Sequence, residues 1–197
     1  MPHPGAMSGL LSSLVQADRR RGDAPDDAAD RLNRLRAGVL GANDGIVSVA
    51  AIVVGVAGAT TRSGTILAAG LAALIGGALS MALGEYVSVS SQRDSQRASG
   101  VPKDEHVSPW SATSASGLSF LAGGVLPLLA MVLLPEAVRI PITVVVVLAA
   151  LAATGAGGAA LGGAPVARAT ARVMIGGAIA LLVTFLIGRL LGVSGIA

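Results

Sequence analysis

Two acidic side chains lie within hydrophobic stretches of this sequence, and their position makes them the strongest candidates for chemistry. Asp44 lies in Leu40–Val49 and Glu85 in Leu79–Val89, whereas the other nine of the 11 acidic residues lie in polar segments. An ionised carboxylate at the centre of a membrane helix costs about 2.5–3.5 kcal/mol on insertion, so such residues usually mark a path for ions or protons. The alternative is a packing role near the membrane interface.

A methionine could extend this acidic pair into a metal site. Met81 precedes Glu85 by four residues and would share its helical face, deeper in the membrane. Carboxylate oxygens with a softer thioether suit Fe²⁺ or Mn²⁺ better than Mg²⁺ or Ca²⁺. Asn43 and Ser48 could add oxygen ligands near Asp44, although Asn43 must face about 100° away from it. A lone methionine in an apolar helix usually only packs, so residue types alone leave the role of Met81 open.

Composition excludes several other kinds of chemistry. The chain has no cysteine and two histidines, His3 and His106, which excludes thiolate metal sites, disulfides and a multi-histidine site within one chain. The apolar segments contain no nucleophile–base pair, and the chain lacks a G-x-x-x-x-G-K-[ST] motif, so we expect neither an enzyme nor a nucleotide-driven pump. The net charge is only +3, with basic residues at segment ends, which argues against nucleic-acid binding. No cofactor is expected.

Membrane-spanning helices are the elements that must position the acidic residues. Hydrophobic residues make up 53% of the 197 residues and charged residues 13%, a composition typical of a protein in lipid. An all-α integral membrane bundle of five helices is therefore predicted within residues 36–197. Each apolar segment is close to the ~20 residues that cross a bilayer, and the segments run over 37–59, 65–90, 112–134, 140–161 and 171–192.

The polar segments indicate how the bundle is arranged in the membrane. Residues 1–35 predict a polar tail, in which Asp26–Arg36 could form an amphipathic helix on the membrane surface. A short loop at 91–111 joins the second and third spans. With five crossings, 11 of the 14 Lys and Arg residues lie on the side of the N-terminus. The positive-inside rule therefore places the N-terminus in the cytosol and the C-terminus on the far side.

Depth and spacing predict how the spans meet. Asp44 lies about seven residues, or ~10 Å, into the first span, and Glu85 lies about five residues from the cytoplasmic end of the second, so we expect both carboxylates at similar depth. Small residues four apart favour close helix packing, and such pairs could also serve a homodimer interface. These pairs are Gly41 with Gly45, Ser80 with Gly84, and Gly158 with Gly162.

Two longer motifs resemble a known family. Arg36–Gly55 reads RAGVLGANDGIVSVAAIVVG, and Leu79–Asp94 reads LSMALGEYVSVSSQRD. Both are similar to the vacuolar iron transporter family, also called the VIT family, and the second follows its signature S-M-A-x-G-E-Y-V-S-V-S-S-Q almost letter for letter. The resemblance covers about residues 31–192. It implies a homodimer that moves Fe²⁺, and often Mn²⁺, out of the cytosol in exchange for protons.

The resemblance also assigns residues. By residue matching, Asp44 and Met81 line the translocation path near the dimer interface, and Glu85 is the next candidate metal ligand. Many relatives carry a glutamate-rich helical domain between the second and third helices, but 91–111 is too short for it, so the chain resembles the short, nodulin-like branch. Adjacent residues of this loop could dock a metal ion weakly, although a solvated loop is the simpler interpretation. These residues are Asp104, Glu105 and His106.

Charge balance indicates a mechanism. Two carboxylates can neutralise a divalent cation in a low-dielectric path, and when empty they repel one another, so protonation would stabilise the metal-free state. This predicts metal–proton antiport, with the metal ion, protons, the lipid bilayer and a second copy as partners. The alternative is a non-transporting membrane scaffold or accessory subunit. The alanine-, glycine- and arginine-rich composition suggests a bacterial inner membrane.

Overall fold

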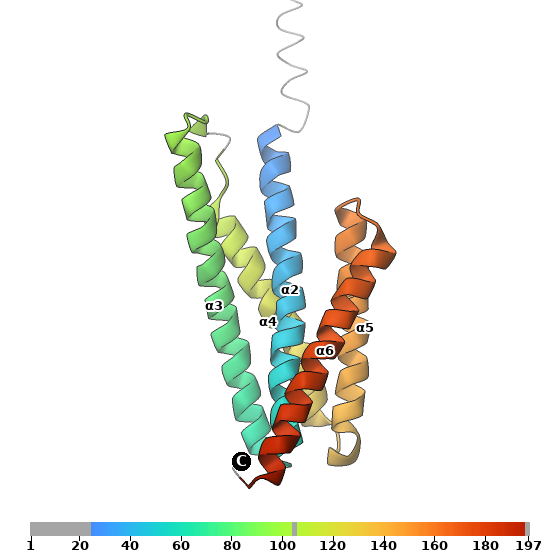
Figure 1. Cartoon of the computed structure of the whole chain (residues 1–197). Helices are drawn as coiled ribbons and strands as arrows, with labels where there is room; N and C mark the ends of the chain where they lie inside the picture. The colour runs from blue at the N-terminus through green and yellow to red at the C-terminus, as the bar shows by residue number, and fades with distance from the viewer. Residues whose placement is uncertain (1–24, 104–105, 196–197) are drawn as a thin grey trace, which may run out of the picture.

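A computed structural model describes residues 25–103 and 106–195 (Figure 1). Within these residues the chain forms five α-helices, and each is long and apolar enough to cross a membrane. The predicted all-α architecture with five spans is confirmed. The predicted tail up to residue 24 lies outside the described residues. The helices are α2 (Pro25–Ala59), α3 (Ser63–Ala98), α4 (Pro109–Leu133), α5 (Glu136–Leu161) and α6 (Val166–Val193).

Local sequence explains where several helices begin and end. Ser108 caps α4 by accepting a hydrogen bond from the Ser111 backbone N–H at 3.4 Å, and Pro109 occupies the first helical turn, where its missing N–H costs nothing. The α5–α6 turn contains Gly163 at φ +66°, a conformation that glycine adopts without strain, followed by Pro165 just before α6. The Gly-Gly-Ala-Pro segment at 162–165 is therefore a turn between two spans.

Two segments predicted as polar connection or tail are helical in the structure. α3 continues to Ala98, so the connection to α4 is 99–108 and not 91–111. Charged residues can end a membrane span without ending the helix. In the part of α3 beyond residue 90, Asp94 and Arg97 form an ion pair at 3.7 Å, one turn apart. α2 begins at Pro25, so the segment predicted to form a surface helix forms the first turns of the same helix as the first span.

α2 is the central helix of the bundle and contacts each of the other four (Figure 1). Its closest partner is α4, where Gly41 and Gly45 face the backbone of Ser116 and Phe120 so tightly that a Cβ on either glycine would collide. The predicted close packing of this glycine pair is confirmed, and its partner is a helix of the same chain. Buried side chains such as Val53 complete the core.

The two ends of the bundle differ in charge. We call the end that holds the start of α2 the basic end, because most described basic side chains lie there. These side chains are Arg31, Arg34, Arg36, Arg93, Arg97, Lys103, Arg168 and Arg172.

At the opposite end, Arg139 lies just before the predicted fourth span of 140–161 but is part of α5, with 4% of its surface exposed. Its guanidinium donates to the Thr61 carbonyl at 3.1 Å and to Ser63 Oγ at 3.4 Å. We call these contacts the Arg139 latch. They join α5 to the short connection between α2 and α3.

Candidate functional site

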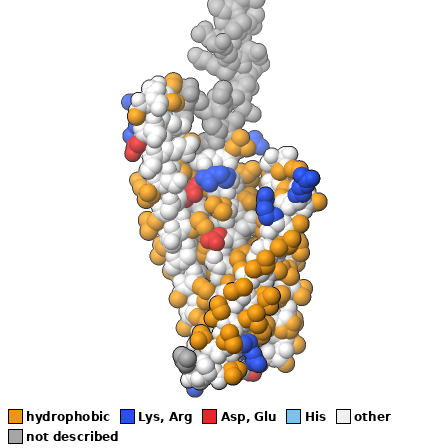
Figure 2. Space-filling view, viewed as in Figure 1, with side chains coloured by type: hydrophobic (Ala, Val, Ile, Leu, Met, Phe, Trp, Pro, Cys, Tyr) orange, Lys and Arg blue, Asp and Glu red, His pale blue; other side chains and the backbone are white. Residues whose placement is uncertain are grey.

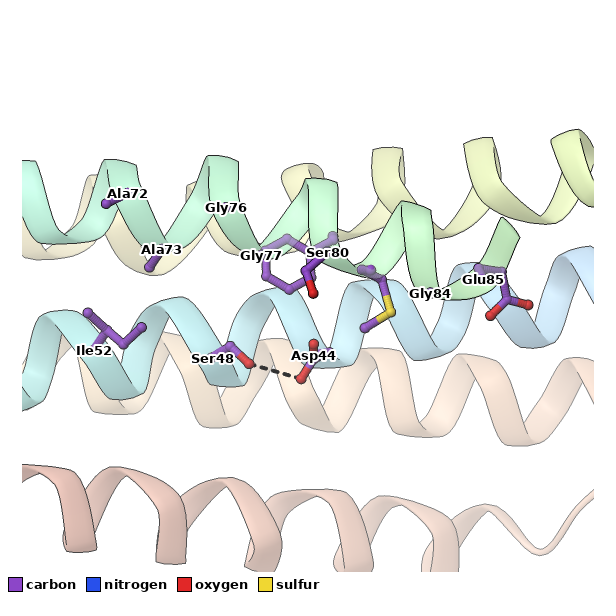
Figure 3. Close-up of a pocket in the computed structure, with 12 residues that line it drawn as sticks. Asp44, Ser48, Ile52, Ala72, Ala73, Gly76, Gly77, Ser80, Gly84 and Glu85 are labelled. Atoms are coloured by element: carbon purple, nitrogen blue, oxygen red, sulfur yellow. Dashed lines mark hydrogen bonds between the residues drawn. The ribbon is translucent and has the colours of Figure 1, made fainter. Parts of the chain in front are cut away.

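An open groove of about 480 Å³ runs between α2 and α3 and contains the three residues singled out from the sequence, Asp44, Met81 and Glu85. Figure 3 shows Asp44 and Ser48 pointing from α2 toward α3, with Glu85 farther along the groove. Figure 2 shows acidic side chains on this face, bordered by hydrophobic ones. The remaining lining is mostly small or apolar: Ile52, Ala72, Ala73, Gly76, Gly77, Ser80, Gly84 and Phe120.

Helical periodicity explains why these residues meet. On α2, Asp44 and Ser48 are four residues apart and therefore share one face. On α3, Gly77, Met81 and Glu85 follow the same spacing. Because α2 and α3 are antiparallel neighbours joined by a short connection, these two faces oppose each other. The structure thus brings the three predicted residues into one groove, and their binding of metal stays a prediction.

Asp44 is half-buried in the middle of this groove. Its Oδ1 accepts a hydrogen bond from Ser48 Oγ at 2.9 Å, one helical turn along α2 (Figure 3). This bond orients the carboxylate and provides one hydrogen bond to compensate for its partial removal from water. Ser48, predicted as a neighbouring oxygen donor, lines the groove beside it.

Glu85 has a different partner and a different environment. Only 7% of its side chain is exposed, and its Oε1 accepts a hydrogen bond from Arg36 Nη2 at 2.7 Å. Sequence reasoning missed this ion pair because its members are 49 residues apart. The sequence did contain a signal for this pair. Arg36 lies just before the first span, Glu85 lies near the end of the second span at the same membrane face, and the two carry opposite charges.

The sequence predicts similar depths for the two carboxylates, but the structure places them at different depths. Asp44 precedes the end of α2 at Ala59 by 15 residues, and Glu85 follows the start of α3 at Ser63 by 22 residues. The seven-residue difference corresponds to about 10 Å along the helices. The error arose because depth was counted from predicted span ends, whereas the short α2–α3 connection sets the register. Glu85 therefore lies toward the basic end, with Asp44 deeper.

Asn43 does not belong to the groove. Its Oδ1 accepts a hydrogen bond from Thr154 Oγ1 of α5, so it faces α5 and not the α3 groove. This agrees with the expected 100° separation from Asp44. Sequence reasoning missed Thr154, because nothing in its apolar surroundings indicates which helix it faces.

The loop residues proposed as a weak docking site give little geometry. Asp104 and Glu105 lie outside the described residues, and the His106 Nε2 atom lies 3.0 Å from the Val101 carbonyl oxygen. In the part of the chain that the structure describes, no three His, Cys, Asp or Glu side chains cluster as a metal site would. The groove therefore offers two separate carboxylates and a thioether.

The α3 side of the groove lacks covering side chains. A Cβ added to Gly76 or Gly84 would have no neighbouring atom within 4 Å, and Ser80 between them is exposed. The predicted Ser80–Gly84 pair therefore faces open space and does not pack helices within this chain. A second hollow of about 280 Å³, between α2 and α6, shares Ile52 with the groove and is almost wholly apolar.

Comparisons with known proteins identify relatives over nearly the whole chain. The sequence profile of the VIT family matches residues 35–102 and 97–189. "Vacuolar iron transporter homolog 5" of Oryza sativa subsp. japonica is 43% identical, covering 94% of this chain and 95% of its own. "Vacuolar iron transporter homolog 2" of Arabidopsis thaliana is also 43% identical, covering 86% of this chain and 90% of its own.

Proposed function

The chain belongs to the VIT family, and we propose that it carries a divalent metal ion, Fe²⁺ or Mn²⁺, out of the cytosol in exchange for protons. The relatives' names support a multi-pass membrane transporter of metal rather than an enzyme. The observation that carries the proposal is the groove, which places Asp44, Met81 and Glu85 along one side of a membrane-length helix pair.

The donor set suits the proposed cargo. Asp44 and Glu85 supply hard oxygen ligands, and Met81, one turn deeper than Glu85, supplies a softer sulfur. With about 10 Å between the two carboxylates along the helix axis, the ion would pass from Glu85 at the mouth to Asp44 in the middle. The proposed order along the path is therefore Glu85, Met81 and Asp44.

Protons would replace the metal on the return step. An ionised carboxylate without a counter-ion is costly in a low-dielectric groove, so a proton would take the place of the departing metal ion at Asp44. The single described hydrogen bond from Ser48 offsets part of that cost without supplying a positive charge. Metal release and proton uptake would thus be linked at this residue.

The groove also supports a homodimer. Its α3 wall of Gly76, Ser80 and Gly84 is open, so in a single chain a carboxylate would border lipid, where an exposed charge is expensive. Small residues let a second helix approach closely, and a twofold-related copy would bring the same face. The second copy would close the groove into a path bounded by protein on all sides.

Charge distribution supports the orientation. The basic end holds most of the described Lys and Arg side chains, so we place it in the cytosol, with the C-terminus on the far side. Glu85 then lies nearer the cytosolic mouth. A bacterial inner membrane remains our proposed location on composition, and the relatives are named for the plant vacuole.

Metal flux into proteoliposomes under a proton gradient tests the proposal. We expect the wild-type protein to move Mn²⁺ and Fe²⁺ and to move protons in the opposite direction. Asp44→Asn should lower the initial rate at least about tenfold, because it removes a charged ligand. Met81→Leu, which keeps volume but removes sulfur, should lower it less.

Two matched variants control for nonspecific damage. Asp94→Asn removes an exposed acid from α3 outside the groove, and Met174→Leu replaces a partly buried methionine of α6. Both should transport normally. Normal flux in both Asp44→Asn and Met81→Leu would refute the assigned path. A folded wild-type protein that forms oligomers but carries no metal would instead indicate the scaffold alternative.

A further inference from the structure

The ion pair at the mouth of the groove is asymmetric. Glu85 is 7% exposed, whereas the Arg36 side chain is 55% exposed and reaches Glu85 from the basic end. Arg36 Nη2 also donates to Asn33 Oδ1 at 3.2 Å, one turn nearer the start of α2. The acid is therefore fixed in the protein, and the guanidinium lies at the boundary with a second acceptor already in reach.

Arg36 supplies a positive charge next to the buried Glu85 carboxylate when the groove holds no metal ion. A buried carboxylate without a positive partner would be strongly unfavourable, and removing one partner of such a pair leaves the other uncompensated. The guanidinium supplies the positive charge at 2.7 Å from Oε1. Glu85 therefore has a compensating positive charge without a metal ion, which distinguishes it from Asp44, whose described hydrogen-bond partner is the neutral Ser48 hydroxyl.

A divalent cation ligated by Glu85 would compete for the same carboxylate. Bound to that group, it would lie a few ångströms from the guanidinium, where like charges repel strongly at the edge of a low-dielectric groove. Arg36 can withdraw because more than half of its side chain is exposed and because Asn33 accepts one of its N–H groups. Arg36 and the metal ion are thus alternative occupants of one site.

We propose that Arg36 is a tethered counter-cation that occupies the Glu85 site in the metal-free protein and is displaced by the entering metal ion. This inference rests on the proposed function. It makes Arg36 a specificity-determining residue, because a cation fixed to the chain is present at high effective concentration. A monovalent ion carries no more charge than the guanidinium and displaces it poorly, whereas a divalent ion has the electrostatic advantage.

The apparent KM for Mn²⁺ in proteoliposomes tests this role. Arg36→Gln keeps a long polar side chain but removes the competing charge, so the KM should fall roughly two- to fivefold, the size expected for one partly exposed ion pair. The maximal rate should fall with it, because Glu85 then releases metal less readily. Arg36→Lys should stay near wild type. Arg31→Gln, which removes an exposed charge from the same end of α2, controls for surface potential.

Because the chain has no native cysteine, a single introduced cysteine can be modified chemically, and the same folded preparation can be measured before and after modification. An Arg36→Cys variant should have the lowered KM. Modification with an aminoethyl thiosulfonate, which restores a positive charge on a side chain of similar length, should raise the KM again. The neutral hydroxyethyl reagent should not. In a Glu85→Gln background, Arg36→Gln should leave the KM unchanged, because the two residues act on one site.

The outcomes separate this inference from the proposed function. Lack of wild-type flux overturns both. Wild-type flux with an unchanged or raised KM in Arg36→Gln overturns the inference alone and assigns Arg36 a structural role. Equal effects of the charged and neutral reagents also overturn it, because competition would then not depend on charge.

Discussion

The two sides of α2 that face α4 and α3 use small residues in opposite ways, and these residues come from α2 itself in the first case and from α3 in the second. Toward α4, Gly41 and Gly45 allow the helix backbones to touch, and an added methyl group would meet the carbonyl oxygen of Ser116 or Phe120. Toward α3, the groove is walled by Gly76 and Gly84, where an added methyl group would meet nothing. One face is a closed seam, and the other is an open wall.

The difference shows that small-x-x-x-small spacing does not specify a role. In the seam, glycine provides contact, and the packing energy comes from neighbouring backbone and core atoms. At the open wall, glycine and serine provide room beside a carboxylate. The same motif thus stabilises the fold at one position and leaves space for an ion, or for a second copy, at another.

The largest expected effect comes from filling the seam. Gly45→Ala should separate α2 from α4, since its Cβ would collide with backbone that cannot rotate away, and overpacking of this kind costs about 1–3 kcal/mol or more. Thermal unfolding in detergent and size-exclusion chromatography would measure the loss. Gly84→Ala is the matched control and should be as stable as wild type. Equal stability of both variants would remove the distinction between the faces.

A bulky side chain on the open wall should break function without breaking the fold. Gly84→Leu has room within the chain, so the protein should stay folded, yet the proposed second copy could no longer approach. Cross-linking in liposomes should show loss of dimer, with Mn²⁺ flux reduced at least about tenfold. Gly64→Leu, on α3 outside the groove and also without neighbours, should do neither. A dimer that survives Gly84→Leu contradicts the proposed interface.

A hydrogen bond on the face of α2 toward α5 should affect stability and not transport. Thr154→Val removes the donor to Asn43 and leaves a partly buried amide oxygen without it, at a cost of about 1–2 kcal/mol. The melting temperature should fall. The KM for Mn²⁺ should not change, because Asn43 faces away from the groove. A clear KM change would connect α5 to the metal path.

The smallest effect is expected from the corresponding bond in the groove. Ser48→Ala removes the donor to Asp44 Oδ1, so the carboxylate loses orientation but keeps its charge. The KM for Mn²⁺ should rise about two- to fivefold, as for one modest hydrogen bond. The melting temperature should stay near wild type. The opposite pattern, lower stability with unchanged KM, would make this bond a packing contact like that of Thr154.

Sequence patterns predicted the features that depend on one helix at a time. Five spans, the shared face of Met81 and Glu85, and the turn of Asn43 away from Asp44 follow from hydrophobicity and helical periodicity. Features set between helices were missed. The Arg36–Glu85 pair depends on the register of two antiparallel helices, and that register is set by the three-residue connection after Ala59.

Burial of Arg139 was missed for a related reason. A charged residue beside a proline-containing turn resembles a loop residue when only hydropathy is considered. Its carbonyl partner at Thr61 lies 78 residues away, and no local pattern identifies it. Likewise, the Gly41–Gly45 spacing predicts that a helix packs there, but only the assembled bundle shows that the helix is α4.

The Arg139 latch fixes the start of α3 at the opposite end of the helix pair from the Arg36–Glu85 contact. It holds the start of α3 at one end, while 22 residues away Glu85 meets α2 through one ion pair. That arm is about 33 Å long, so a tilt of about 5° around the latch moves Glu85 by about 3 Å. Such a displacement is larger than the 2.7 Å contact itself. The Arg36–Glu85 contact is therefore sensitive to small changes in the tilt of α3.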